Sequence, residues 1–226
     1  MLKWPANENP TPSSAAIRRT SRDEDGVNAQ LAELFAFASR TFPPEHPFAE
    51  IEAMPSDAPV PPIWMLGSTS AGAAIAASCG LGFAFAGHFS MAEASRAIDT
   101  YRSRFRPTAA LPSSRVILAL TVVCGESDAV AEELAAPLRV AFARMATGAR
   151  GRFPSLEEAR MHRFTSQELA VVERFMHGAI VGGPARVAEG LERVARETGA
   201  DELMISTVVP TPDERVRSYE RIAALA

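Results

Sequence analysis

The chain has 226 residues and a formal net charge of -4 at pH 7, so it can form one domain with a substantial core and lacks the basic excess of a nucleic-acid-binding protein. Hydrophobic residues make up 47% and charged residues 22% of the chain, as in soluble globular proteins. Cys79 and Cys124 are far from a Cys-x-x-Cys spacing, and the first residues lack the apolar core of a signal peptide, so we expect a cytoplasmic protein with reduced, buried thiols.

The amino-terminal part predicts one helix between two irregular stretches. Residues 1–15 are rich in proline, asparagine and serine without periodicity, which predicts an irregular tail ahead of a domain over residues 16–226. Residues 23–40 place apolar side chains on one helical face. A proline-broken loop then runs to Pro62 and contains His46, which we expect at the surface.

Residues 61–90 predict a strand, a tight turn, a small-residue helix and a second strand. The apolar run at 63–66 fits a strand that is buried on both faces. Gly67, Ser68 and Thr69 then place small and hydroxyl-bearing residues where a helix begins. Free backbone N–H groups and hydroxyls at such a turn can all point at one anion, so the sequence predicts an anion site here.

Two other interpretations of this stretch remain open. No charged residue occurs between Asp57 and Glu93, which is long enough for a membrane helix of about 20 residues, although glycines and hydroxyl residues interrupt the run. The order strand, Ser70 at a sharp turn and helix is also that of a serine hydrolase, with Ser70 as the nucleophile. Ser68 stands where the first glycine of that motif belongs.

The next part of the chain predicts two helices around the strongest strand signal. The spacing of Ser90 and Glu93 indicates a capping box and a helix from Met91. Residues 116–124 are a long apolar strand. Ser127 then caps a helix that contains a proline, at position 137, and ends near residue 145.

The last part predicts a loop, three helices and a fourth strand. Residues 147–163 are polar and basic and predict an irregular loop, after which Thr165 and Glu168 have capping-box spacing. Gly182 and Gly183 precede a helix and could form a second phosphate nest or a plain helix cap. A strand over 202–209 and a final helix capped by Thr211 complete the chain. The inner face of that helix is expected at Val216, Tyr219 and Ile222.

Alternation of strands and helices predicts an α/β fold with a parallel sheet and right-handed crossovers. The predicted strands are 63–66, 83–86, 116–124 and 202–209. A (β/α)8 barrel needs eight strands and about 250 residues. The sequence therefore predicts fewer strands than a whole barrel contains.

Residues 61–90, PPIWMLGSTSAGAAIAASCGLGFAFAGHFS, resemble the luciferase-like flavin-dependent monooxygenases, the family of bacterial luciferase. Further segments resemble the family in the same order. They are AIRR at 16–19, FPPEHPFAEIEAMP at 42–55, YRSRFRP at 101–107 and IVGGPARVAEGLERVARETGADELMIST at 180–207. The resemblance implies an incomplete TIM (β/α)8 barrel, with about the last four strands and their helices, because the family's first strands have no counterpart here.

The resemblance also implies chemistry. Family members use O2 and reduced FMN, supplied by a reductase, to oxygenate a small organic substrate. By matching position, Gly67, Ser68 and Thr69 would hold the flavin phosphate. The family usually has a hydroxyl residue where this chain has Gly72 and a proline where it has Gly82. One phosphate contact would therefore be absent and the entry to the second strand looser. No catalytic residue is assigned, because the residues most able to act belong to the missing strands.

Half a barrel would expose two sheet edges and an apolar interior. Such a surface favours aggregation unless something covers it, and pairing with a second copy of the chain, or with a separate amino-terminal half, would be the simplest cover. A half-barrel remnant or partner subunit without flavin is an alternative function.

The histidines and acidic residues give no metal site, because no cluster has metal-ligand spacing. His88 follows the second predicted strand and is either a pocket residue or a histidine that is hydrogen-bonded beside a helix cap. His162 and His177 are expected at surface and helix-packing positions.

Overall fold

The computed structural model describes residues 24–55, 57–58, 61–149 and 151–225. The chain divides into two compact units, one up to Pro62 and one from Ile63 onward, and each is described by itself. The predicted tail over 1–15 and the AIRR segment lie outside the described residues. Among the helices of the described part, none has the length and apolar character needed to span a bilayer.

The amino-terminal unit contains the predicted helix, α2 (Glu24–Ser39), and a loop held by aromatic rings. The Phe37 ring lies 4.7 Å from that of Phe42 and 5.9 Å from that of Phe48, centroid to centroid. His46 stacks on Phe42 at 4.4 Å, and its Nδ1 accepts the N–H of Phe48. The expectation of a surface histidine is therefore correct only in part, because His46 is a half-buried member of this aromatic cluster.

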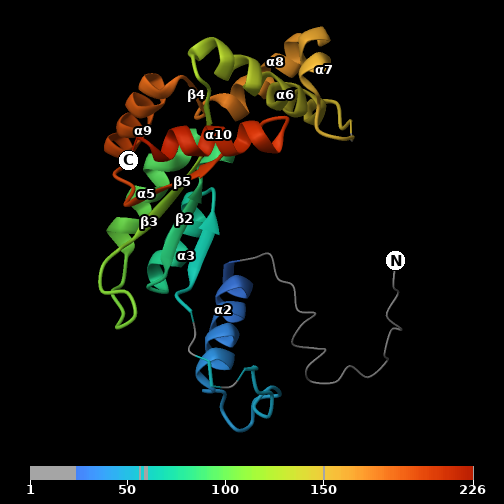
Figure 1. The fold of residues 1–226 in the computed structure, drawn as a ribbon. Helices are drawn as coiled ribbons and strands as arrows, with labels where there is room; N and C mark the ends of the chain where they lie inside the picture. The colour runs from blue at the N-terminus through green and yellow to red at the C-terminus, as the bar shows by residue number, and fades with distance from the viewer. Residues whose placement is uncertain (1–23, 56, 59–60, 150, 226) are drawn as a thin grey trace. The chain divides into compact units, whose positions relative to one another are not determined.

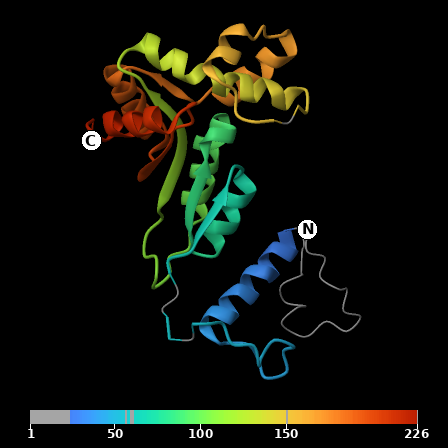
Figure 2. The same cartoon turned by 45° about the vertical axis from the view of Figure 1, so that its right-hand side comes forward.

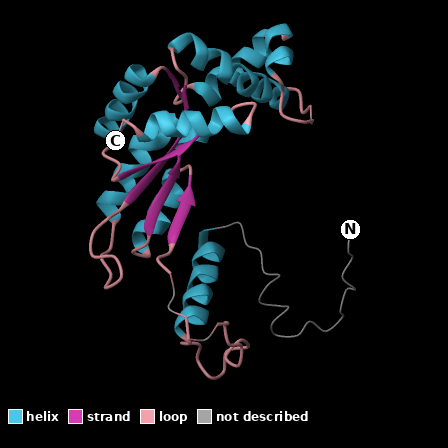
Figure 3. Cartoon of the chain, in the orientation of Figure 1, coloured by secondary structure: helices cyan, strands magenta, loops and turns pink. Residues whose placement is uncertain are grey.

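The second unit is built on a parallel five-stranded sheet (Figure 1). Its strands are β1 (Trp64–Gly67), β2 (Gly82–Ala86), β3 (Val116–Cys124), β4 (Ile180–Gly182) and β5 (Glu202–Ser206). Because β2 and β5 both pair with residues 117–119 of β3, they lie on opposite sides of it, while β4 pairs with the last residues of β3. Figure 3 shows β3 as the long central strand of this arrangement.

The helices of this unit follow the strands in the alternating order that the sequence predicts. They are α3 (Ser70–Ser78), α4 (Gly87–Ser90), α5 (Ala94–Arg104), α6 (Asp128–Ala146), α7 (Leu156–Met161), α8 (Ser166–Met176), α9 (Pro184–Thr198) and α10 (Pro212–Ala223), with a 3-10 turn, η1 (Met91–Glu93), before α5. Figures 1 and 2 show α6, α7 and α8 grouped beyond the carboxyl-terminal end of the sheet.

One face of the sheet packs against α3, α5 and α9 in a common core. The alanines of α3, three of which are fully buried, let this helix lie close to the strands. Tyr101 of α5 is fully buried as well, and its hydroxyl donates to the carbonyl of Leu81 at 2.8 Å. Alternate residues of β1 and β2 supply the strand side of this core, including Met65 and Phe83.

Most of the alternate residues on the other face are apolar, and some of them are uncovered. Trp64 and Leu66 of β1 are 37% and 69% exposed, and Met204 of β5 is 51% exposed. Among the described strands, β1 pairs only with β2, so it is an edge strand of this sheet. The prediction of a strand buried on both faces is therefore wrong for β1, because the helices cover only one of its faces.

Several predicted helix signals are confirmed. Ser127 caps α6, which contains Pro137 and ends at Ala146. Thr165 and Glu168 form both hydrogen bonds of a capping box at the start of α8. The glycine after α9, Gly199, has a left-handed φ of 61° and ends that helix as expected.

Other local predictions are wrong. Ser90 makes no capping hydrogen bond, because the chain is already helical in α4 before it reaches Glu93. The loop predicted over 147–163 contains α7, and the three-residue strand β4 was not predicted. Val216 and Tyr219 of α10 are exposed, and Ser218 is the buried residue of that helix. Cys124 is buried as expected, but Cys79 is only half-buried.

Candidate anion-binding site

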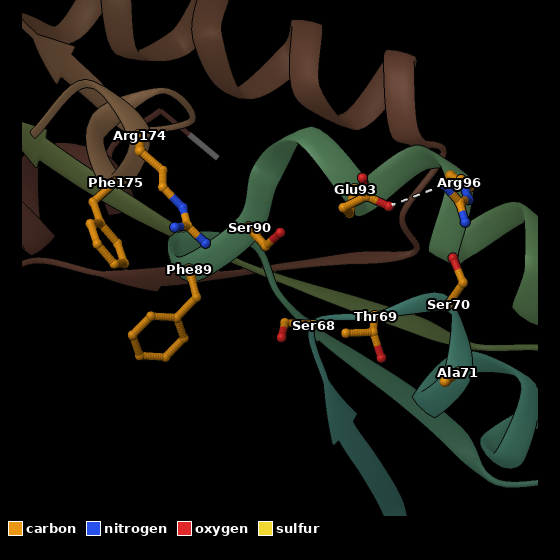
Figure 4. A pocket seen from close by; sticks show the side chains of 10 residues that line it. All are labelled: Ser68, Thr69, Ser70, Ala71, Phe89, Ser90, Glu93, Arg96, Arg174 and Phe175. Atoms are coloured by element: carbon orange, nitrogen blue, oxygen red, sulfur yellow. Dashed lines mark ion pairs between the residues drawn. The ribbon is translucent and has the colours of Figure 1, made fainter. Parts of the chain in front are cut away.

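The predicted turn connects the carboxyl end of β1 to the amino end of α3 (Figure 4). Gly67 is the last residue of β1, and Thr69 caps α3, with its Oγ1 accepting the N–H of Gly72 at 3.3 Å. The carbonyl of Thr69 accepts the N–H of Ala73. Carboxyl ends of parallel strands are where α/β proteins place ligands, so the turn has the position that the sequence predicts for a site.

A pocket of about 530 Å³ opens beside this turn. Its lining comes from the turn and α3, from the α4–α5 segment and from α8, and consists of Ser68, Thr69, Ser70, Ala71, Phe89, Ser90, Glu93, Arg96, Arg174 and Phe175. Ser68 and Thr69 of the predicted turn are therefore among the lining residues. Gly67 precedes the lining residues and is not one of them.

Ser70 begins α3 and has a buried Oγ without a hydrogen-bond partner in the described part of the chain. A serine nucleophile needs a base within hydrogen-bond reach, and the structure provides no such contact for Ser70. Ser70 does not have a positive φ, unlike Arg40 among the described non-glycine residues. The strained elbow of a hydrolase is therefore absent from this turn. A buried hydroxyl without a partner instead suits a ligand that supplies one.

Charged side chains surround the open side of the pocket. Arg96 and Glu93 form an ion pair at 3.7 Å, with exposed side-chain fractions of 76% and 48%, so the pair is weak. Arg174 is exposed and has its guanidinium 5.7 Å from the ring centroid of Phe175. Two arginines and one glutamate give the lining a positive balance, although the whole chain is acidic.

His88 lies next to this pocket but is not among its lining residues. Its ring is 4.3 Å from that of Phe89, and its Nδ1 is buried without a partner among the described residues. Burial lowers the pKa of His88, and a hydrogen bond with the backbone of Ala119 partly offsets this shift. The imidazole therefore favours its neutral form at neutral pH. His88 therefore does not line the pocket, and its hydrogen bond with the backbone of Ala119 favours the other interpretation, a histidine that is hydrogen-bonded beside a helix end.

The second predicted phosphate nest is occupied by a side chain of the protein itself. The N–H of Gly183 donates to Oδ1 of Asp128 at 2.7 Å. Arg186 also pairs with this carboxylate, at 3.6 Å. Since Asp128 takes the N–H that a phosphate would need, the alternative interpretation of the glycine pair as a plain helix start is favoured.

The remaining histidines have different surroundings. His162 lies 3.4 Å from Oε1 of Glu168 and packs edge-on against Phe164, so it is a packing residue rather than a surface one. His177 follows α8 and lines a smaller pocket of about 260 Å³, which shares Phe89, Ser90 and Arg174 with the main pocket. Among the described residues, no group of three or more His, Cys, Asp or Glu side chains could hold a metal ion.

Sequence reasoning missed the residues that face the turn across the pocket. Arg96, Arg174 and Phe175 lie on helices with ordinary amphipathic patterns, and nothing in their local sequence distinguishes them from surface residues. Only the packing of α5 and α8 near the end of β1 brings them to the pocket.

The chain is similar in sequence to proteins of Escherichia coli and Bacillus subtilis. A "Luciferase-like monooxygenase" of Escherichia coli (strain K12) is 30% identical over 91% of this chain and 60% of its own length. The "Uncharacterized protein YceB" of Bacillus subtilis (strain 168) is 33% identical over 88% of this chain and 60% of its own length. The chain therefore spans about three fifths of the length of these relatives.

Solved structures agree with the sequence relatives. Apo-MsnO8 superimposes with a TM-score of 0.76 at 30% identity, covering 97% of this chain and 66% of that chain. The oxygenating constituent of 3,6-diketocamphane monooxygenase from Pseudomonas putida, solved in complex with FMN, shares the fold with a TM-score of 0.57 at 15% identity, over 96% and 68% of the two chains. Residues 14–202 match the model of the luciferase-like monooxygenases. The chain therefore belongs to the luciferase-like monooxygenase family.

Proposed function

We propose that this chain is the carboxyl-terminal part of an FMN-dependent monooxygenase and that the Gly67–Ser68–Thr69 turn holds the phosphate of FMN. The observation that carries the proposal is the pocket at the carboxyl end of β1, where hydroxyl side chains stand around the start of α3. Helix N-termini bind phosphate because their first N–H groups have no partner within the helix. One protein of the same fold was solved with FMN bound.

The residues present fit a phosphate group. The N–H groups of Gly72 and Ala73 are taken by Thr69, whereas no described acceptor takes those of Ser70 and Ala71. The buried Oγ of Ser70 also lacks a partner. These donors, with the hydroxyl of Ser68, could together satisfy several oxygens of one phosphate.

Bound FMN would supply the oxidative chemistry, and the protein would supply position and exclusion of water. We propose that reduced FMN comes from a reductase and that the complete enzyme uses O2 on a small organic substrate. This chain would contribute the phosphate end of the flavin site.

We also propose that the sheet is part of an incomplete (β/α)8 barrel, corresponding to about its last four strands, with the short β4 placed at the end of β3. Two observations support this. All strand pairs are parallel, and the face opposite α3, α5 and α9 carries apolar side chains that remain exposed, Trp64, Leu66 and Met204. In a closed barrel the corresponding face is the packed interior. A second copy of the chain or a complementing amino-terminal half would cover it.

Titration of the purified protein with FMN, followed by flavin fluorescence, tests the flavin proposal. Ser68→Ala with Thr69→Ala should weaken binding by about 2 kcal/mol, as expected for lost hydrogen bonds to a charged group. The matched control is Thr100→Ala with Ser103→Ala, because both hydroxyls are exposed on α5 and donate within the helix. Equal affinity of the two double variants would contradict a phosphate contact at the turn.

A further inference from the structure

We propose that Arg96 and Arg174 form the cationic half of the anion site, so that a phosphate dianion is held between the hydroxyl turn and two guanidinium groups. This rests on the proposed function for the identity of the ligand as FMN. The arrangement itself applies to any phosphate that enters the pocket.

The two arginines approach the pocket from different helices. Arg96 belongs to α5 and Arg174 to α8, and both line the same pocket of about 530 Å³ as Ser68. Figure 4 shows the Ser70 side chain pointing toward Arg96, while Arg174 reaches in from the other side of the pocket. The Ser70 Oγ is buried and has no described hydrogen-bond partner, which is a second observation that points to a ligand-binding position here.

Arg174 is available to a ligand. It forms no ion pair with a described carboxylate, and its contact with Phe175 is a cation–π contact, with the guanidinium carbon 5.7 Å from the ring centroid, which is not a hydrogen bond. The planar fork of arginine matches two oxygens of a phosphate. Arg174 can therefore keep its aromatic contact while it donates to an anion.

Arg96 needs to exchange one partner for another. Its pair with Glu93 is long, at 3.7 Å, and both side chains are largely exposed, so the pair contributes little. A phosphate dianion offers more charge and more acceptor oxygens than one carboxylate. Glu93 also lines the pocket and repels an incoming anion. Glu93 therefore competes with the ligand, and its removal should strengthen binding.

The test compares FMN, riboflavin and inorganic phosphate as probes. Flavin binding is measured by fluorescence and phosphate binding by calorimetry, on wild type and on Arg174→Gln, Arg96→Gln and Glu93→Gln. We expect each arginine variant to weaken FMN binding about tenfold and to leave riboflavin binding unchanged, and Glu93→Gln to tighten FMN binding. Arg163→Gln and Glu192→Gln are matched controls, since both residues are exposed and lie outside the pocket lining.

The outcomes separate this inference from the proposed function. If wild type binds FMN and the arginine variants bind it equally well, the cationic half is overturned and the flavin proposal stands. If wild type binds phosphate with the expected dependence on the arginines but does not bind FMN, the inference is supported and the flavin proposal is overturned. If wild type binds neither FMN nor phosphate, both are overturned. A loss of riboflavin binding equal to that of FMN would show a structural effect and would also overturn the inference.

Discussion

The indole of Trp64 lies over Gly82, its register partner on the neighbouring strand. A Cβ atom added at Gly82 would stand 2.5 Å from the indole ring, which is closer than atoms approach in folded proteins. The family resemblance, with a proline at this position, predicts a looser entry to β2. The structure shows instead that the indole fills the space that the missing side chain leaves.

Gly82→Ala should therefore destabilise the fold by about 1–3 kcal/mol, the usual cost of overpacking. Trp64 is 37% exposed, so its ring can partly turn away, which favours the lower end. Urea unfolding measures the free energy of unfolding of each variant. Adding Trp64→Ala should remove the effect of Gly82→Ala. The control is Gly151→Ala, where no atom lies within 4 Å of an added Cβ. Equal unfolding midpoints for Gly82→Ala and this control would contradict the packing argument.

Gly72→Ser should strengthen FMN binding. The family usually carries a hydroxyl at this position, and a Cβ at Gly72 would meet its nearest neighbours at 3.8 Å and 3.9 Å, which are ordinary contacts. Position 72 directly follows Ala71, which lines the pocket. A serine hydroxyl there should donate to the phosphate and strengthen FMN binding by about 1 kcal/mol. Fluorescence titration measures it, with Gly72→Ala as the control that adds the Cβ alone. A serine variant no tighter than the alanine variant would rule out the contact.

Acid should weaken the capping box at the start of α8. A backbone hydrogen bond from Thr165 lowers the pKa of Glu168 below its usual 4.5, opposed by burial and assisted by the Thr165 hydroxyl and His162. Because the folded-state pKa is the lower one, this contribution to stability is complete above about pH 4.5 and is lost as the pH falls through the folded-state pKa.

Glu168→Gln should therefore flatten the acid side of the stability curve, measured by urea unfolding midpoints between neutral and acidic pH. Some slope should remain, because Ser155 lowers the pKa of Glu158 in the same way. Glu192→Gln, on the exposed face of α9, should keep the wild-type slope. Parallel curves for wild type and Glu168→Gln would show that the capping carboxylate does not titrate as argued.

The exposed apolar face of the sheet should control assembly. Leu66 is 69% exposed on the edge strand β1, and burial of such an edge and face against a second copy would remove both from water. Sedimentation velocity should show an assembly of wild type that Leu66→Lys dissociates. Val130→Lys is the control, since Val130 is also exposed and apolar, at 37%, but lies on α6. A wild type that sediments as one chain would leave only a complementing amino-terminal half as cover.

The sequence predicted elements whose signals are local. Residues 116–124 are apolar except for Thr121, because β3 is paired on both sides and buried on both faces, and the prediction of this strand is confirmed. Gly199 ends α9 because a left-handed residue is needed there. In contrast, the three residues of β4 are too few for a pattern, and their strand geometry depends on pairing with Val122–Cys124. The capping box of Ser155 and Glu158 was present in the sequence and could have revealed α7.

Some residues of the candidate site could be inferred from the sequence, and others could not. Ser68 and Thr69 follow a predicted strand and precede a predicted helix, so their place at the end of β1 could be inferred from the chain order. Arg174 comes from a helix more than one hundred residues later, and tertiary packing alone brings it to the pocket. Likewise, only the tertiary structure shows that the Ser70 hydroxyl is buried without a described hydrogen-bond partner.

The most direct test of the central claim compares FMN with riboflavin, which lacks the phosphate, on wild type and on the Ser68→Ala, Thr69→Ala double variant. If the turn binds the phosphate, wild type should prefer FMN, and the double variant should lose about 2 kcal/mol of that preference while its affinity for riboflavin stays unchanged. A wild type that binds both flavins equally, or a double variant that keeps the full preference for FMN, would contradict the account.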